Sequence, residues 1–119
     1  MTAGGPAPRE CLFCRIVKGE IPADIVADAE DAIAFRDINA QAPSHFLVVP
    51  RRHVASLDNA DDAVELGRLL LLAARVARDQ GIAEPGYRVV VNTNTHGGQT
   101  VQHLHLHVLG GRQMKWPPG

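Results

Sequence analysis

The sequence lacks an excess of basic residues, since twelve lysines and arginines stand against thirteen acidic residues and the formal net charge is −1. Broad electrostatic binding to nucleic acid needs a basic face, so we expect no nucleic-acid partner. A small anionic ligand held in a local pocket is still allowed.

Long apolar runs are also missing, because none approaches the roughly 20 residues that span a bilayer. Residues 1–9 are rich in Gly, Pro and Ala and lack the apolar core of a signal peptide. We therefore expect a cytoplasmic protein that does not associate with membranes.

Cysteine is scarce as well. The two cysteines, Cys11 and Cys14, are too close in sequence for a disulfide between them to stabilise a fold, so they are interpreted as thiols or metal ligands. Their Cys-x-x-Cys spacing suits zinc, although one such pair is half a site. A thioredoxin-like redox pair is an alternative, but nothing around it resembles the β-α-β pattern of that fold. A pair of unliganded thiols is the third interpretation.

What the sequence does contain fits one domain of 119 residues. We expect residues 1–10 to be a disordered tail and residues 11–119 to form the domain. Hydrophobic patterning and turn residues predict one short helix, one long helix and about five strands, and hence an α+β domain on an antiparallel sheet. The helices are expected at residues 11–18 and 62–80, and the strands at residues 25–27, 32–35, 45–49, 87–92 and 101–109.

The expected long helix has clear ends and a broad apolar surface. Asp62 and Glu65 have the spacing of a capping box, and Gly81 is placed to end the helix. Polar residues form only a narrow stripe, so the apolar arc is wider than one core face requires. Either a second copy of the chain covers the surplus, or the helix is wedged deeply into its own domain.

Three histidines alternate with apolar residues near the end of the sequence. In a strand over residues 101–109, His103, His105 and His107 would share one face, which is costly unless the imidazoles are solvated or used. One use is a catalytic metal, but the Cα atoms of His103 and His107 would lie roughly 13 Å apart, which does not suit Zn–N bonds of about 2 Å. The other use is divided labour among a nucleophile, a phosphate partner and a supporting residue, for which imidazole has a suitable pKa.

The loop before the histidines favours divided labour. Gly97 and Gly98 allow backbone N–H groups to approach an anion closely, and Thr100 adds a hydroxyl donor. A glycine pair alone more often marks a turn. A glycine-and-hydroxyl loop that opens onto a face of histidines predicts a phosphate site.

The segment His103-Leu104-His105-Leu106-His107-Val108-Leu109 resembles the His-φ-His-φ-His-φ-φ signature of the histidine-triad (HIT) superfamily, where φ is apolar. The resemblance covers nearly everything after residue 10, and the Trp-Pro-Pro-Gly ending at residues 116–119 is similar to the Hint branch. Further matching segments are Ile21-Pro22-Ala23, Phe35-Arg36-Asp37-Ile38, Gln41-Ala42-Pro43-Ser44-His45-Phe46 and Val49-Pro50-Arg51-Arg52-His53. The resemblance implies a HIT-like fold and a homodimeric, nucleotide-binding purine nucleoside phosphoramidase.

The resemblance also implies a role for each matching residue. His105 would attack the α-phosphorus, and His107 would contact the phosphate and the leaving group. His103 would support and orient them, with His45 packed nearby. The implied ribose ligand is Asp37, which could instead simply cap a turn. The remaining implied nucleotide contacts are Ile38 at the base and Asn92, Gly98, Gln99 and Thr100 around ribose and phosphate.

The resemblance extends to a metal and to an activity. Some bacterial relatives bind zinc through the cysteine pair and two histidines, here Cys11, Cys14, His53 and His103; that ion would be structural, and catalysis would need no cofactor. The implied activity is hydrolysis of nucleoside 5′-phosphoramidates, or of aminoacyl-adenylate-like substrates, to AMP or GMP through a nucleotidyl-histidine. The alternatives are a nucleotide-binding regulatory or scaffold protein with incidental turnover, and a dinucleoside polyphosphate hydrolase, against which the Trp-Pro-Pro-Gly ending argues.

Overall fold

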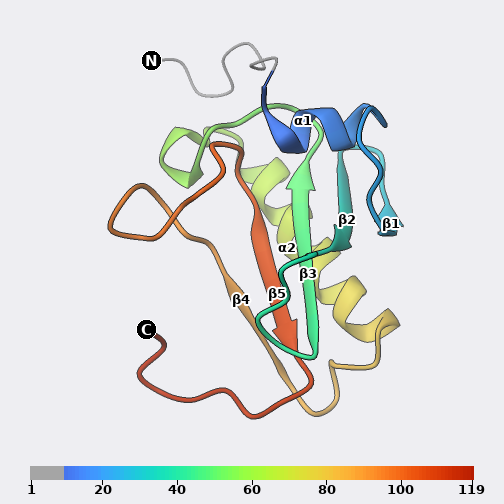
Figure 1. The fold of residues 1–119 in the computed structure, drawn as a ribbon, viewed down its shortest axis with the longest axis vertical. Coiled ribbons are helices and arrows are strands. Elements are labelled where there is room, and N and C mark those ends of the chain that lie inside the picture. Colours follow the sequence, from blue (N-terminus) through green and yellow to red (C-terminus); the bar gives the residue numbers. More distant parts are fainter. Residues whose placement is uncertain (1–9) are drawn as a thin grey trace.

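A computed structural model describes residues 10–119, so the tail expected over residues 1–10 lies outside the described part except for Glu10 (Figure 1). The elements in chain order are α1 (Leu12–Val17), β1 (Ile25–Asp28), β2 (Ala32–Arg36), β3 (Ser44–Pro50), the short 3-10 helix η1 (Leu57–Asn59), α2 (Ala63–Asp79), β4 (Tyr87–Val90) and β5 (Leu106–Gly110). Both expected helices and all five expected strands are present. Within this part of the chain, no helix is long and apolar enough to cross a membrane.

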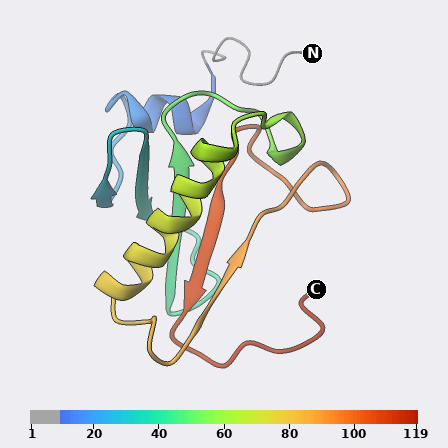
Figure 2. The same cartoon turned by 180° about the vertical axis from the view of Figure 1, so that it is seen from behind.

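One antiparallel sheet holds all five strands in the order β1-β2-β3-β5-β4. The long helix α2 lies across one face, as Figure 2 shows, and contacts β2, β3 and β5. The short helix α1 covers the opposite face at one end of the sheet, where its residues pack with β2 and β3. This is the predicted α+β arrangement, and it leaves β1 and β4 as edge strands.

The central strand β3 is buried on both faces because each helix covers one of them. Phe46 and Val48 pack toward α2, whereas Leu47 and Val49 belong to the apolar cluster beneath α1. A strand covered on both sides has a continuous apolar run, which explains the sequence of residues 46–49. The same alternation places His45 on the α1 face.

Helix α2 begins and ends where its capping residues predict. The Asp62 carboxylate accepts hydrogen bonds of 3.0 and 3.1 Å from two backbone N–H groups of the first turn. Gly81 adopts a left-handed φ of 77° just after the last turn, a conformation that glycine reaches without strain. The Glu65 carboxylate pairs with Arg52 instead of closing the expected capping box.

The apolar arc of α2 is only partly covered by the chain itself. The buried stripe is formed by Leu69, Leu72, Ala73, Val76 and Ala77. Leu70 and Leu71, on the remaining arc, are 53% and 72% exposed. Of the two interpretations of the broad arc, complete burial within its own domain is therefore wrong.

The strand expected over residues 101–109 is shorter than predicted, since β5 covers only Leu106–Gly110. Residues 101–105 run irregularly because the Leu104 N–H donates to the Val54 carbonyl, 2.6 Å away, rather than to a neighbouring strand. Leu104 is nevertheless buried with Leu106 and Val108 in the core beneath α2, as expected. Strand β4 likewise ends at Val90, before the expected end at residue 92.

Candidate active site and metal centre

A cavity of about 600 Å³ opens on the α1 face of the sheet, between α1, β2, β3 and β5. This volume lies in the range of typical small-molecule sites. One part of its wall is apolar and is formed by Leu12, Phe13, Ile16, Ile21, Pro22, Phe35, Leu47 and Val101. The polar part is formed by Arg36, Asp37, Asn39, Gln41, His45, Thr100, His105 and His107. Such a wall suits a ligand with an apolar ring at one end and charge at the other.

His105 is buried at the polar end of the cavity in a fixed orientation. Its Nδ1–H donates to the His103 carbonyl at 2.7 Å, and Phe13 packs edge-on against its ring at a centroid distance of 5.1 Å. Burial lowers the pKa of His105, although the hydrogen bond to the His103 carbonyl opposes this shift. The imidazole is therefore neutral near pH 7 with its lone pair on Nε2, which is the form a nucleophile needs.

His45 and His107 form a hydrogen-bonded pair whose proton positions follow from the backbone. The Gln41 backbone N–H donates to His45 Nδ1 at 3.0 Å, so a neutral His45 carries its hydrogen on Nε2. That N–H donates to His107 Nδ1 at 2.9 Å, which leaves the hydrogen of a neutral His107 on Nε2. The rings of His105 and His107 lie 5.0 Å apart, so His107 presents a donor beside the neutral His105.

Both imidazoles of this pair are held in the neutral form. Burial, followed by the neighbouring His105 and His45 rings, lowers the pKa of His107 to about 4. Burial also lowers the pKa of His45, while the charge of Asp37, whose Oδ2 lies 3.4 Å from His45 Nε2, opposes this shift. The three histidines of the cavity therefore present neutral hydrogen-bonding groups at pH 7.

His103 lies on the α1 face with His105 and His107, as predicted, but its ring belongs to a different group of residues. The residues of the described chain that line the cavity do not include it, and its side chain is fully buried. Its Nε2–H donates to the Pro50 carbonyl at 2.9 Å, and its Nδ1 faces two cysteines and His53. His103 consequently supports His105 through its backbone carbonyl rather than its ring.

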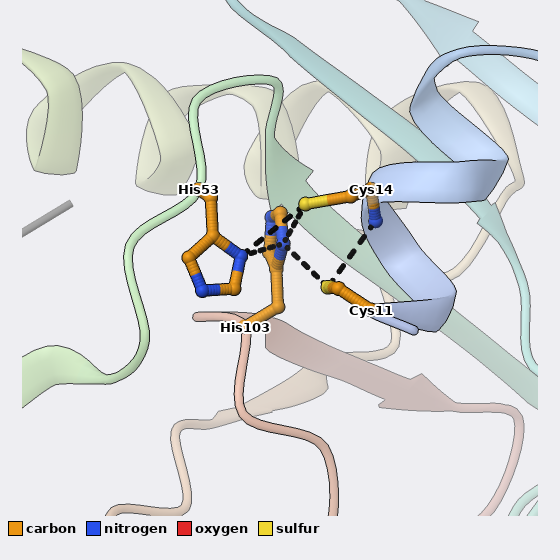
Figure 3. A group of neighbouring side chains, drawn as sticks. All are labelled: Cys11, Cys14, His53 and His103. Carbon is orange, nitrogen blue, oxygen red and sulfur yellow. Dashed lines mark hydrogen bonds between the residues drawn. The ribbon is translucent and has the colours of Figure 1, made fainter. Parts of the chain in front are cut away.

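Figure 3 shows the second group of side chains, Cys11, Cys14, His53 and His103, which we call the Cys/His cluster. Cys14 Sγ lies 3.2 Å from His53 Nδ1 and 3.4 Å from His103 Nδ1. Cys11 Sγ lies 3.4 Å from His103 Nδ1, and the two Nδ1 atoms are 3.3 Å apart. Tetrahedral zinc with its usual bond lengths needs about 3.3 Å between nitrogens and about 3.6 Å between sulfur and nitrogen. The four expected ligands therefore fit a closed zinc site.

The protonation of the Cys/His cluster also suits a metal. Because the His103 Nε2–H is used by Pro50, the Nδ1 that faces the cluster carries a lone pair. Burial, followed by the adjacent Cys11, raises the pKa of Cys14 to about 12. A coordinated cation reverses this effect, because coordination deprotonates a thiol. Near pH 7 the Cys14 thiolate is thus stable only together with a cation.

Asp37, Ile38 and Thr100 lie at the cavity, where the resemblance puts nucleotide contacts. Ile38 is fully exposed on the rim. Asp37 accepts the Asn39 backbone N–H at 2.9 Å and also lines the cavity, so its turn-capping and cavity-facing roles coexist. The cavity lining within residues 10–119 leaves out Asn92, Gly98 and Gln99.

The glycine loop is packed against itself. A Cβ at Gly97 would lie 2.3 Å from the Thr93 carbonyl oxygen, so glycine is needed there for close approach of two backbone segments. The Gly98 N–H donates to the Thr95 carbonyl at 3.0 Å. These glycines therefore shape the loop, which argues against the expected presentation of the Gly98 amide to a phosphate.

The buried Gln99 side chain stabilises the same loop through hydrogen bonds. Its Nε2 donates to the Ala55 and Val101 carbonyls at 2.8 and 3.0 Å, and its Oε1 accepts the Asn94 N–H at 3.0 Å. Its backbone N–H donates to the Asn94 carbonyl at 3.1 Å. Gln99 thus positions Thr100 and Val101 at the cavity, and its amide group is used for hydrogen bonds within the chain.

Two contributions to the site have no counterpart in the sequence-based assignment. Leu12, Phe13 and Ile16 of α1, which we call the α1 wall, form one side of the cavity. The apolar spacing i, i+1, i+4 in residues 11–18 is the signal that predicts a shared helix face there. The other contribution is the Gln41 backbone N–H, which no side-chain pattern reveals.

The fold and the site together define a class of protein: a small α+β domain with a hydrogen-bonded set of neutral imidazoles at one end of an apolar cavity. Comparison with known proteins identifies the family within this class. The family model described as "HIT domain" matches residues 18–114. The chain belongs to the HIT domain family.

Individual relatives agree with this assignment. The chain is 48% identical over 112 residues to an uncharacterized HIT-like protein of Synechococcus elongatus, covering 92% of this chain and 97% of that protein. It is 46% identical over 107 residues to the purine nucleoside phosphoramidase of Escherichia coli, covering 88% of this chain and 90% of that protein. A HIT family hydrolase from Legionella pneumophila has a solved structure that matches with a TM-score of 0.90 and 49% identity, covering 92% of this chain and 100% of that one.

Proposed function

We propose that the chain is a hydrolase that cleaves purine nucleoside 5′-phosphoramidates and releases AMP or GMP. Membership of the HIT family and the likeness to the Escherichia coli phosphoramidase support this substrate class. The observation that carries the proposal is the neutral His105, held by the His103 carbonyl at 2.7 Å and adjacent to His107. A nucleophile and a hydrogen-bond donor thus lie side by side at the polar end of a cavity of suitable size.

In the first proposed step, the His105 Nε2 lone pair attacks the α-phosphorus and the bond from phosphorus to the substrate amine breaks. The substrate brings one proton into the site on its amine nitrogen, His107 Nε2–H hydrogen-bonds to the phosphate and positions this leaving group, and the amine departs with the proton it carries. The product of this step is a nucleotidyl-histidine on His105. An aminoacyl adenylate fits the same step with a carboxylate as leaving group.

In the second proposed step, water attacks the phosphorus and the bond from phosphorus to His105 Nε2 breaks. The oxygen of the water stays on phosphorus, its surplus proton is released to solvent, and the nucleoside monophosphate leaves. Both imidazoles are then back in their starting forms, so the cycle consumes one substrate and one water and needs no cofactor.

The ligand contacts follow from the shape of the cavity. The base is proposed to lie between the apolar wall and Ile38, the ribose against Asp37, and the phosphate near Thr100 and the histidines. A bound zinc would be held by the four side chains of the Cys/His cluster. Its role would be structural, because protein ligands fill all four coordination positions.

Mass spectrometry after rapid mixing tests the proposed nucleophile. Mixing with an adenosine phosphoramidate and quenching at alkaline pH should give an adenylyl mass on the peptide that carries His105. His105→Ala should lose on the order of a thousandfold or more in turnover yet still bind AMP, because the cavity and Asp37 remain. His96→Ala, in the exposed loop, is the matched control and should behave as the unmodified protein.

Two outcomes would contradict the proposal in different ways. If no adduct forms and His105→Ala keeps near-normal turnover, the nucleophile is not His105. If the unmodified protein binds AMP tightly but turns over no phosphoramidate, a nucleotide-binding regulatory protein becomes the better assignment.

We also propose that two copies of the chain associate. Val64, Leu70 and Leu71 of α2 are exposed apolar side chains, and the edge strand β4 is only half-buried. A second copy that covers them would form an apolar interface of the kind found in obligate dimers. Light scattering at micromolar concentration should give twice the chain mass of 12.8 kDa. A single-chain mass would contradict this proposal.

A further inference from the structure

Helix α1 contributes residues both to the Cys/His cluster and to the wall of the cavity. Cys11 is its N-cap and Cys14 lies in its first turn, and both reach into the Cys/His cluster (Figure 3). The α1 wall, formed by Leu12, Phe13 and Ile16 on the same helix, lines the cavity. The position of one cavity wall is therefore tied to the position of two cluster ligands.

Besides these cluster ligands, α1 is held mainly by the apolar packing of Phe13, Ile16 and Val17 on the sheet. With six residues, α1 is far too short to be stable on its own, because helix nucleation is costly. Its ion pair, between Arg15 and Glu20 at 3.7 Å, is about half exposed on both sides, and such surface pairs contribute little. The main anchors are Phe13, packed edge-on against Phe35 and His105, and the Cys/His cluster.

His103 makes a second connection between the two groups. Its Nδ1 belongs to the cluster, and its Nε2–H is fixed by the Pro50 carbonyl. Its own carbonyl accepts the Nδ1–H of His105 and so orients the proposed nucleophile. A change in the cluster can therefore reach the cavity by two routes, through α1 and through the backbone of His103.

We propose that zinc in the Cys/His cluster acts on nucleotide binding, because it fastens the α1 wall and the His103 backbone in the geometry that the cavity needs. This inference rests on the proposed nucleotide-binding function. Without the metal, only contacts of 3.2 to 3.4 Å between cysteine sulfurs and imidazole nitrogens link α1 to the cluster, and α1 keeps its apolar packing on the sheet as its remaining anchor. Metal occupancy then sets the affinity for nucleotide even though the ion does not touch it.

Equilibrium binding of AMP to the full chain tests this coupling without relying on turnover. Elemental analysis first establishes one zinc per chain, and chelation then removes it. Calorimetry should show AMP affinity falling at least tenfold on chelation and returning when zinc is added back. Hydrogen exchange should show backbone protection lost over residues 12–18 and 103–107 in the same step, with α2 unchanged.

Two variants separate the metal from the helix. Cys11→Ser removes a zinc ligand but keeps a side chain that caps a helix well, so α1 retains its N-cap. In the presence of zinc this variant should bind AMP as weakly as the metal-free protein. Arg15→Gln changes the exposed side of α1 and should leave zinc content, AMP affinity and exchange unaltered.

The outcomes distinguish this inference from the proposed function. Equal AMP affinity with and without zinc, or a chain that takes up no zinc, overturns the coupling and leaves the phosphoramidase proposal standing. Failure of the zinc-loaded chain to bind AMP at all overturns both.

Discussion

The role of His45 as the residue that positions His107 leads to a specific prediction. His45 Nε2–H donates to His107 Nδ1 at 2.9 Å and thereby keeps the hydrogen of His107 on Nε2, toward the leaving group. His45→Ala removes this donor. His107 then loses its orientation and its preference for one tautomer, but the nucleophile His105 keeps its hydrogen bond to the His103 carbonyl.

The expected loss depends on the leaving group. Proton donation by a positioned side chain contributes about 10²–10⁴-fold to a rate. In His45→Ala the orienting partner is lost but His107 itself remains. For an alkylamine phosphoramidate, kcat/KM should therefore fall about a hundredfold, the lower end of that range. A nitrophenyl ester of AMP has a leaving group that needs no proton, so its hydrolysis should slow by no more than about fivefold.

His45→Gln provides the matched comparison. Glutamine can place an N–H donor at nearly the reach of His45 Nε2, so it should recover about tenfold of the activity lost in His45→Ala. Steady-state kinetics of both variants with both substrates measures the effect. Equal losses for the two leaving groups, or no recovery with glutamine, would show that His45 is merely structural and that the proton assignment is wrong.

Three further predictions concern stability. Because the pKa of His107 falls from its ordinary 6.5 to about 4 in the folded chain, stability should be retained above pH 6.5 and fall toward pH 4, by about 1.4 kcal/mol per pH unit. Urea unfolding of His107→Gln should show a smaller fall than the unmodified protein. Gly97→Ala should lower the melting temperature more than Gly98→Ala, because its Cβ would meet Thr93, whereas Gly98 has a φ of 79° but open space; the reverse order would refute the packing argument. Leu69→Ala should cost about 2–5 kcal/mol by urea unfolding, because the side chain is buried beneath the sheet-facing side of α2; a loss below 1 kcal/mol would contradict this.

Much of the fold was predictable because its signals are local. Asp62 and Gly81 mark the ends of α2, and turn residues separate the short strands. The failure over residues 101–105 has a physical cause: alternating histidine and leucine give the same period as a strand, but the Leu104 N–H bonds to Val54 in another loop. A sequence pattern reports which residues are apolar, and it does not report the partner of a backbone N–H group.

The site was predictable to the extent that it depends on residue types. The histidine spacing indicates that His105 and His107 are residues of the functional site, and both line the cavity. The resemblance also implies the separate role of His103, but the sequence does not show that this role is exercised on His105 through the His103 backbone carbonyl. The glycine pair carries a further constraint that the sequence does not show, since Gly97 lies too close to the Thr93 backbone to accept a side chain.

The register between β3 and β5 limits how this protein can change in length. His45 stands opposite Leu109 and His107 opposite Leu47, so the two histidines are diagonal neighbours on one face of the sheet. Deleting or inserting one residue within either strand would turn one of the imidazoles to the α2 side and separate the pair. The turn between β1 and β2 is not part of this pairing. Length variation among active descendants of this chain should therefore accumulate in such turns, while β3 and β5 keep a constant residue count.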